Sequence, residues 1–482
     1  ELGATRAGVT GEAPSDVLWH YNLSARHLDK LCERVDTFSV SGDGERLVVR
    51  HRDDIIVVPS SHKVDDDDPA CIRVDLTRLR RTVNPRAEWR QMFDENGRLM
   101  ASHYWREDMN GVDWDGVLNR YRPLVDLCHV VDDLHDILWE TVAELNTSHS
   151  YVSASGAAGD SDMRAGLLGA DVSSGADGAK VVRVIPGESS DPRAWSPLRA
   201  AGVAVTEGDV IVAVDGRKVG ADGNLGELLE GSAGRVVELT VHRGENERQV
   251  AVVPMADEAP LRYHDWVASR RRYVEEHSGG RLGYLHVPDM VSDGWAELHR
   301  QIGEATRHEG VIADVRFNHG GHTSQLVVER LARRVVGWDY SRWYATADTY
   351  PQNAVRGPIV MVTNQWAGSD GDIVAAATQA MGYAKVIGER SWGGVVGIDG
   401  RFDLVDGTSV TQPRYAGWYG SYGWGVENHG VDPDIVVTVS PEDWEADRDV
   451  QLDAAIAECL RQLDDKPAAT APELPGPAFG RC

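Results

Sequence analysis

The chain has 482 residues with 49 Lys or Arg against 76 Asp or Glu, which gives a formal net charge of −27 at pH 7. This length predicts about three domains, with cores large enough to fold without disulfides. Because the acidity argues against phosphate-rich partners, and no apolar run approaches the ~20 residues that span a bilayer, we expect a soluble protein with no nucleic-acid or membrane partner.

Short strands are predicted in the first part of the chain, residues 1–62. Residues 38–49 contain two strands joined by a Gly42-Asp43-Gly44 turn, and residues 55–58 form a third strand. A few antiparallel strands are only marginally stable alone, so we expect them to complete a larger β-structure. The aspartates at 65–68 are typical of a solvated linker.

A helical domain is predicted over residues 75–155. It contains an apolar stripe whose members step by three or four positions, the spacing of one amphipathic helix. The members of the stripe are Leu124, Leu127, Val131, Leu134, Leu138 and Val142. The domain ends in the polar sequence Asn146-Thr147-Ser148-His149-Ser150.

A Gly/Ser/Asp-rich loop at 153–162 leads into a third region, residues 162–256, where short apolar strands surround one helix candidate at 225–230. The strands are expected at 167–168, 181–185, 210–214, 236–241 and 250–253. The segments SPLRAAGV and EGDVIVAVDG resemble those of a PDZ domain. The resemblance implies a small β-sandwich with an open strand edge that can accept a peptide as an added strand. Another small β-barrel is the alternative.

Strands and helices alternate in residues 262–465, which predicts an α/β domain with strands covered on both faces. Strands are expected at 282–287, 310–316, 358–363 and 385–388, and helices at 295–306, 324–334 and 370–381. The Pro/Ala-rich segment 466–482 is expected to be a disordered tail.

Ser369 is the best candidate for a nucleophile. It lies in Ala367-Gly368-Ser369-Asp370-Gly371, before a predicted helix whose N-terminus favours developing negative charge. The alternative is that Ser369 only caps that helix. The segment is not the G-x-S-x-G turn of α/β-hydrolases.

Five segments in one order resemble the C-terminal half of the tricorn protease family, serine peptidases related to the C-terminal processing peptidases. They are Ser148-His149, the PDZ-like region, DVRFNHGGHTSQLVVERLARR, QWAGSDGDI and GWGVENHGVDPDI. The resemblance covers about residues 79–462. It implies a multidomain fold: the end of a β-propeller, a small helical domain, a PDZ-like β-sandwich and a crotonase-like α/β catalytic domain.

The same resemblance implies a catalytic tetrad. Ser369 would be the nucleophile and His149 the general base, while Ser148 and Glu427 would orient the imidazole and stabilise its charged form. The alternative for Glu427 is a surface carboxylate, and His319, His322 and His429 are expected to be bystanders.

Backbone N–H groups of Gly321 and Asp370 would form the oxyanion hole. C-terminal processing peptidases use a Ser–Lys dyad instead, but Gly394 stands where that lysine would be, which favours His149 as the base. Asp339 would line the S1 pocket, contributed by a neighbouring subunit, and would favour a basic P1 residue.

The resemblance further implies peptide substrates, a homo-oligomer (a hexamer) and aminopeptidases acting downstream. No HExxH spacing is present, so neither a metal nor a cofactor is expected. Five scattered cysteines without a CxxC pair are typical of a reduced, cytoplasmic protein. Two alternatives to an active peptidase are an inactive PDZ scaffold that binds peptide C-termini and a crotonase-type acyl-CoA enzyme.

Overall fold

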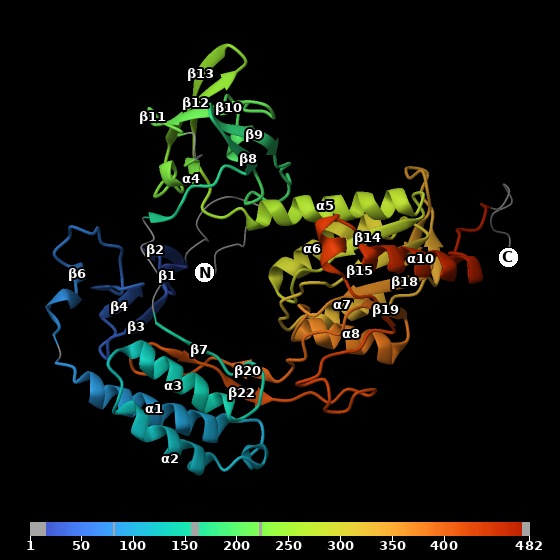
Figure 1. Cartoon of the computed structure of the whole chain (residues 1–482). Coiled ribbons are helices and arrows are strands. Elements are labelled where there is room, and N and C mark those ends of the chain that lie inside the picture. The colour runs from blue at the N-terminus through green and yellow to red at the C-terminus, as the bar shows by residue number, and fades with distance from the viewer. Residues whose placement is uncertain (1–15, 81, 156–162, 221–223, 475–482) are drawn as a thin grey trace. The chain divides into compact units, whose positions relative to one another are not determined.

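The structure, a computed structural model of the chain, describes residues 16–80, 82–155, 163–220 and 224–474 (Figure 1). Much of the loop predicted at 153–162, and residues 475–482 of the predicted tail, lie outside this range. The chain forms two compact units, each made from two stretches of sequence. The first unit is Glu1–Val83 with Asp162–His264, and the second is Asn84–Ser161 with Asp265–Cys482.

The N-terminal part of the first unit consists of short antiparallel strands. Two of them, β1 (Val17–Asn22) and β2 (His27–Glu33), form one pair. Four more form a second sheet in chain order, namely β3 (Thr37–Val40), β4 (Arg46–His51), β5 (Asp54–Pro59) and β6 (Ile72–Arg73). Leu31, Val35 and Leu47 are buried together between these strands. The strands predicted at 38–49 and 55–58 are therefore present.

The second part of this unit is a single antiparallel sheet with strand order β13-β12-β10-β9-β8, and β11 pairs with β10. Its strands are β8 (Ala170–Gly175), β9 (Gly178–Val184), β10 (Val210–Val214), β11 (Arg217–Lys218), β12 (Val237–Arg243) and β13 (Asn246–Val252). The short helix α4 (Leu225–Leu228) packs Leu225 and Leu228 against the buried face of the sheet. The sequence predicted a small β-sandwich with one helix for this region; the strands and the helix are present, and the strands belong to one sheet.

Three helices open the second unit: α1 (Pro85–His103), α2 (Trp114–Val125) and α3 (Val131–Ala143). The prediction of one continuous apolar stripe from Leu124 to Val142 was wrong, because residues 126–130 form a loop and Leu127 is 69% exposed. The carboxylate of Asp133 accepts hydrogen bonds from the N–H groups of His129 and Val130, and so fixes a new helix start there.

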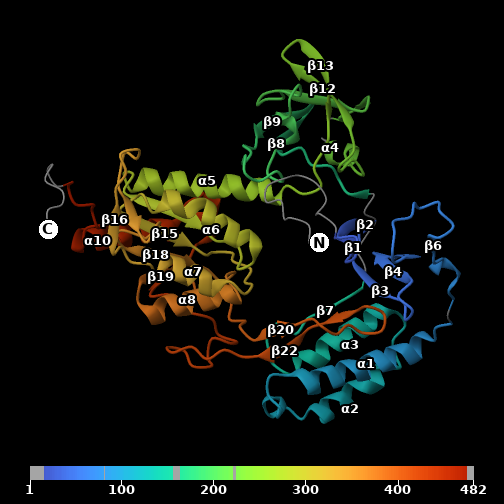
Figure 2. The same ribbon diagram turned by 180° about the vertical axis from the view of Figure 1, so that it is seen from behind.

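A parallel sheet of five strands forms the centre of the second unit, in the order β14-β15-β18-β19-β23. The strands are β14 (Leu282–His286), β15 (Gly310–Asp314), β18 (Ile359–Thr363), β19 (Ala384–Gly388) and β23 (Ile435–Val436). The helices around the sheet are α5 (Ala259–His277), α6 (Ser292–Ala305), α7 (Ser324–Leu331), α8 (Asp370–Met381), α9 (Pro441–Glu445) and α10 (Val450–Asp465) (Figures 1 and 2).

Alternate side chains of each strand enter different cores. Leu285, Ala313 and Met361 pack with residues of α6, α7 and α8 on one face. The residues between them in sequence point to the opposite face, where α10 contacts β15, β18 and β19. All five strands are parallel, so their carboxyl ends lie along one edge of the sheet. Ligand sites of such sheets form at this edge.

A segment of the predicted catalytic domain packs on the helical part instead of the sheet (Figures 1 and 2). Leu404 and Val410 are buried in the same core as Leu134 and Leu138. The strands of this segment are β20 (Gly397–Asp399), β21 (Ser409–Val410) and β22 (Gln412–Tyr415), and β21 pairs with β7 (Val152–Ser153). The predicted helical and catalytic domains therefore share one compact unit.

Part of the predicted tail lies against the α/β part. The N–H of Ala469 donates to the carbonyl of Arg356 at 2.8 Å, so the beginning of the segment 466–482 is ordered by backbone pairing. The hairpin of β16 (Gly337–Asp339) and β17 (Asp348–Tyr350) also belongs to this unit. No helix within the described ranges is both long and apolar enough to cross a membrane.

Candidate active site

Ser369 lies at the sheet edge, after β18 and immediately before α8. Its backbone has φ 58° and ψ −120°, a conformation that non-glycine residues rarely adopt and that stores roughly 1–3 kcal/mol of strain. Its side chain makes no capping hydrogen bond to α8. The structure therefore gives no support to the alternative that Ser369 is a helix cap, since its hydroxyl is not used for that purpose.

Glycines allow the chain to approach Ser369 closely. A Cβ atom on Gly320 would lie 2.4 Å from the Cβ of Ser369. Gly321 has φ 146°, and a Cβ there would lie 2.2 Å from the carbonyl oxygen of Met290. Both distances are below van der Waals contact, so a side chain at either position would displace the backbone beside the serine.

The N–H group of Gly321 is available as a donor. The hydrogen bonds that fix its loop come from neighbouring N–H groups: Gly320 donates to Asn318 Oδ1, and His322 and Thr323 donate to the carbonyl of Met290. None of the hydrogen bonds among the described residues uses the N–H of Gly321. The N–H of Asp370 is in the first turn of α8, where helical N–H groups have no intrahelical acceptor.

Ser148 and His149 lie in the turn that follows α3. The hydroxyl of Ser148 is 2.9 Å from Nδ1 of His149 and donates to Oε2 of Glu427 at 3.0 Å. Because the hydroxyl has one proton and gives it to Glu427, Nδ1 must be the donor toward Ser148. The remaining ring nitrogen, Nε2, then carries the lone pair that a general base needs.

Glu427 connects the two parts of the unit. Its Oε1 accepts the N–H of Ser148 at 2.7 Å, and its Oε2 accepts the N–H groups of Val395 at 2.8 Å and Val396 at 3.0 Å, in addition to the Ser148 hydroxyl. A carboxylate with four donors is held in one position. This arrangement is incompatible with the alternative of a surface carboxylate facing water.

His149 is held by its backbone and by aromatic rings. Its φ is 60°, and its carbonyl oxygen accepts a hydrogen bond from the hydroxyl of Thr411. The imidazole packs edge-on against Tyr151 and Trp392, with ring centroids 5.8 and 5.4 Å apart. Burial lowers the pKa of His149, and the charge of Glu427 partly opposes that effect. The imidazole is therefore neutral at physiological pH.

Trp392 contacts both the histidine and the residue before the serine. A Cβ on Gly368, the residue before Ser369, would lie 2.7 Å from the indole of Trp392, whose ring also packs against His149. Among the described hydrogen bonds, none joins the side chains of His149 and Ser369.

Asp372 is a site residue that the sequence did not indicate. It is fully buried in α8 and accepts hydrogen bonds from the Ser391 hydroxyl and from the N–H groups of Gly393 at 2.8 Å and Gly394 at 3.3 Å. Burial raises its pKa to about 6. Its contacts hold the loop that carries Trp392. Gly394, which stands where the C-terminal processing peptidases have their lysine, thus donates its backbone N–H to Asp372.

Asp339 lies elsewhere in the unit. It is exposed on β16 and pairs in register with Asp348 of β17. Of the predicted site residues, the structure connects Ser148, His149 and Glu427 directly, whereas Asp339 makes no described contact with them. Over the described ranges, no group of three or more His, Cys, Asp or Glu side chains is arranged to hold a metal ion.

Three regions of the chain match known protein families. Residues 281–437 match peptidase family S41, residues 166–257 match the tricorn protease PDZ domain, and residues 85–143 match the tricorn protease C1 domain. The three domains follow one another in the order that the sequence resemblance implied. The family prediction is thereby confirmed.

Individual relatives agree with this assignment. Tricorn protease homolog 1 of Streptomyces coelicolor is 56% identical over 479 residues, covering 98% of this chain and 45% of that protein. The tricorn protease of Thermoplasma acidophilum is 34% identical over 462 residues, covering 96% and 43%. A crystal structure of the tricorn protease matches with a TM-score of 0.86 at 34% identity, over 93% of this chain and 43% of that one. The chain spans less than half the length of these relatives.

Proposed function

Because the chain carries the C1, PDZ and S41 domains of the tricorn protease family, we propose that it acts as a serine peptidase on short peptides. The observation that carries the proposal is the hydrogen-bonded series from Glu427 through Ser148 to Nδ1 of His149. Ser369, whose hydroxyl caps no helix, follows a glycine that lies against the same Trp392 ring as His149. A hydrogen-bonded carboxylate that orients a histidine next to a serine is the arrangement that activates a hydroxyl nucleophile.

In the proposed reaction, Nε2 of His149 removes the proton of Ser369 as its Oγ attacks the scissile carbonyl. The negative charge of the tetrahedral intermediate is stabilised by the N–H groups of Gly321 and Asp370. His149 then gives the proton to the leaving amine, and a water molecule, activated in the same way, releases the acyl group from Ser369.

Ser148 and Glu427 serve the histidine in this scheme. While the imidazole is neutral, they fix its tautomer, and once it is protonated, the carboxylate offsets its charge through the Ser148 hydroxyl. The Coulombic effect of Glu427 on the pKa of His149 has the sign that this role needs, since it favours the protonated form.

Several finer features belong to the same proposal. Asp339 of a neighbouring copy would complete the S1 pocket and select basic P1 residues, in a homo-oligomer that is a hexamer in the family pattern. The strands β1–β6 would be the end of a β-propeller, and the α/β part would be crotonase-like. The enzyme would act in the cytoplasm, with aminopeptidases trimming its products.

A fluorophosphonate probe tests the nucleophile directly, because it labels activated serines. We expect labelling of the parent chain and of Ser440→Ala, which removes a serine that caps α9, and no labelling of Ser369→Ala. Cleavage of a peptide library, mapped by mass spectrometry, should depend on Ser369 in the same way. Absence of both labelling and cleavage would favour the inactive scaffold.

A further inference from the structure

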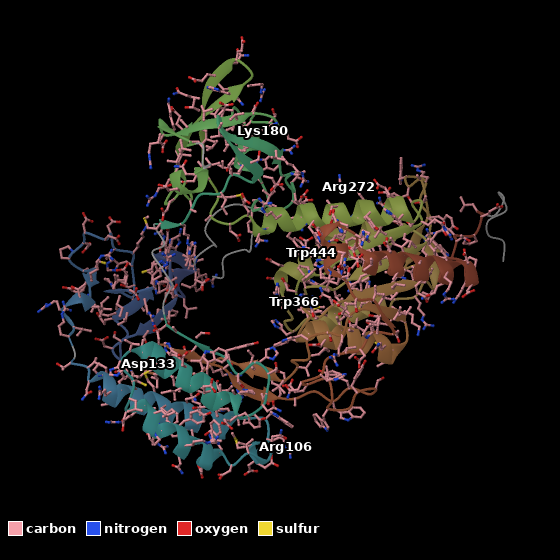
Figure 3. The ribbon with its side chains drawn as sticks, viewed as in Figure 1. Arg106, Asp133, Lys180, Arg272, Trp366 and Trp444 are labelled. Carbon is pink, nitrogen blue, oxygen red and sulfur yellow. The ribbon has the colours of Figure 1, made fainter. Side chains whose placement is uncertain are left out.

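An open cavity of about 680 Å³ lies at the edge of the sheet where the parallel strands end. Four aromatic side chains line it, namely those of Trp266, Phe317, Trp366 and Trp444. Phe317 follows β15 and Trp366 follows β18, so the topology places both at the carboxyl edge. Figure 3 shows Trp444 and Trp366 on the same side of the α/β part. The cavity therefore shares its edge with Ser369.

The arginines that line the cavity are already paired within the chain. Arg316 is 5% exposed and contacts Asp449 at 2.8 Å, Arg270 contacts Asp449 at 3.2 Å, and Arg448 contacts Asp443 at 2.7 Å. Their charges are thus offset before any ligand arrives. An anionic group entering the cavity would have to compete with these carboxylates.

What the cavity offers to a ligand is aromatic surface. Trp366 is 63% exposed and Trp444 is 78% exposed, which is unusual for side chains of this size unless they serve a contact. Glu389 lines the cavity as well, and among the described residues it forms no ion pair. The combination favours an uncharged aromatic or aliphatic group and disfavours a carboxylate.

The cavity wall is connected to the reacting groups by short, anchored segments. The carboxamide oxygen of Asn364 accepts the N–H groups of both Phe317 at 3.0 Å and Trp366 at 3.2 Å. Gly320 follows Phe317 by three residues, and Ser369 follows Trp366 by three. Three residues span at most about 11 Å, so a peptide extended from the scissile bond reaches the cavity within about three residues.

We propose that this cavity is a subsite for a large apolar side chain of the peptide substrate, preferably an aromatic one, within three residues of the scissile bond. The inference rests on the proposed peptidase function and adds a second specificity determinant to it. Trp366 and Trp444 hold the side chain by ring contacts, and Glu389 excludes Asp and Glu from the same position.

The test uses peptides built on one sequence that the parent chain cleaves. Phe, Ala, Asp or Arg is placed in turn at each of the three positions on either side of the scissile bond, and kcat/KM is measured for every peptide. At one position we expect Phe to exceed Ala by about tenfold and Asp to be the poorest. Trp366→Ala and Trp444→Ala should each remove most of the preference for Phe over Ala, mainly by raising KM for the Phe peptide.

The matched control is Trp195→Ala, which removes an exposed tryptophan of the other compact unit and should keep the preference. Both cavity tryptophans are exposed, so their loss should not unfold the chain, which a thermal melt verifies. If the parent cleaves the peptides but prefers Phe at none of the six positions, or prefers Arg to Phe at every position where it discriminates, the proposed subsite is wrong. The proposed peptidase function would be unaffected by that result. A preference for Phe kept in both tryptophan variants would likewise show that the subsite is wrong. If the parent cleaves no peptide, the peptidase proposal itself fails.

Discussion

Replacing Glu427 by Gln removes the charge that supports His149 while keeping the shape of the side chain. In the structure Oε1 accepts one hydrogen bond, from the N–H of Ser148, and Oε2 accepts three. A glutamine has a single carbonyl oxygen, which will take the place of Oε2. Its NH2 group then faces the N–H of Ser148, and because both groups are donors, the hydrogen bond between them is lost.

The magnitude follows from these contacts. At least one charge-assisted hydrogen bond is lost, which is worth about 1.5–3 kcal/mol. If that loss is felt fully in the transition state, where the imidazole is charged, kcat/KM falls by about 10- to 150-fold. The histidine and serine remain, so the effect should be smaller than that of removing either of them.

The pH dependence provides a separate readout. The carboxylate of Glu427 raises the pKa of His149, against the larger lowering caused by burial. Without that charge the pKa of His149 falls further. In the proposed mechanism the neutral imidazole is the active form, so the acid limb of kcat/KM should move to lower pH in Glu427→Gln.

The assay is hydrolysis of one peptide across the pH range by the parent, Glu427→Gln and a control, Glu442→Gln, which changes an exposed carboxylate on α9. The control should match the parent in rate and in profile. An acid limb that stays in place or moves to higher pH in Glu427→Gln would refute the electrostatic coupling. An undiminished rate would refute the orienting role as well.

Three other changes test separate parts of the structure. Ser369→Ala should abolish hydrolysis without the loss of about 1 kcal/mol that removal of a helix cap costs, because its hydroxyl caps nothing; calorimetry that finds such a loss would contradict this. Asp339→Asn should lower kcat/KM for peptides with Arg or Lys at P1 about tenfold or more, and an equal change for Leu peptides would remove Asp339 from the S1 pocket. Asp314→Ala should lower the free energy of unfolding in urea by about 1.5–3 kcal/mol, because the buried guanidinium of Arg316 loses its charge-assisted hydrogen bonds to Asp314 and keeps only those to Asp449, and a loss below 1 kcal/mol would show that the pair is dispensable.

The sequence predicted the parallel strands and the position of Ser369 because both have local signals. Apolar runs mark buried strands, and a Gly-Ser-Asp segment before an apolar helix marks the turn that carries the serine. The contact between Ser148 and Glu427 joins residues 279 positions apart. No periodicity or spacing indicates such a contact, and only the resemblance to a family pointed to it.

Other parts of the site had no signal in the sequence. The N–H groups of Val395 and Val396 hold Glu427, but every residue except proline has such a group, so nothing distinguishes these two beforehand. Asp372 is an acidic residue in a first helical turn, a position where such residues are common whether or not a site is near. The break after Leu124 was missed because apolar residues kept the helical spacing on both sides of the loop.

The division of the site between distant stretches of chain has a consequence for synthesis on the ribosome. His149 emerges first, Ser369 follows much later, and Glu427 leaves the exit tunnel last of the three. Until Glu427 has been synthesised, the histidine has no carboxylate to fix its tautomer. The segment that bears Leu404 and Val410, which packs in the helical core, is itself synthesised only shortly before Glu427. In the proposed mechanism, a nascent or prematurely terminated chain therefore carries Ser369 without an organised base.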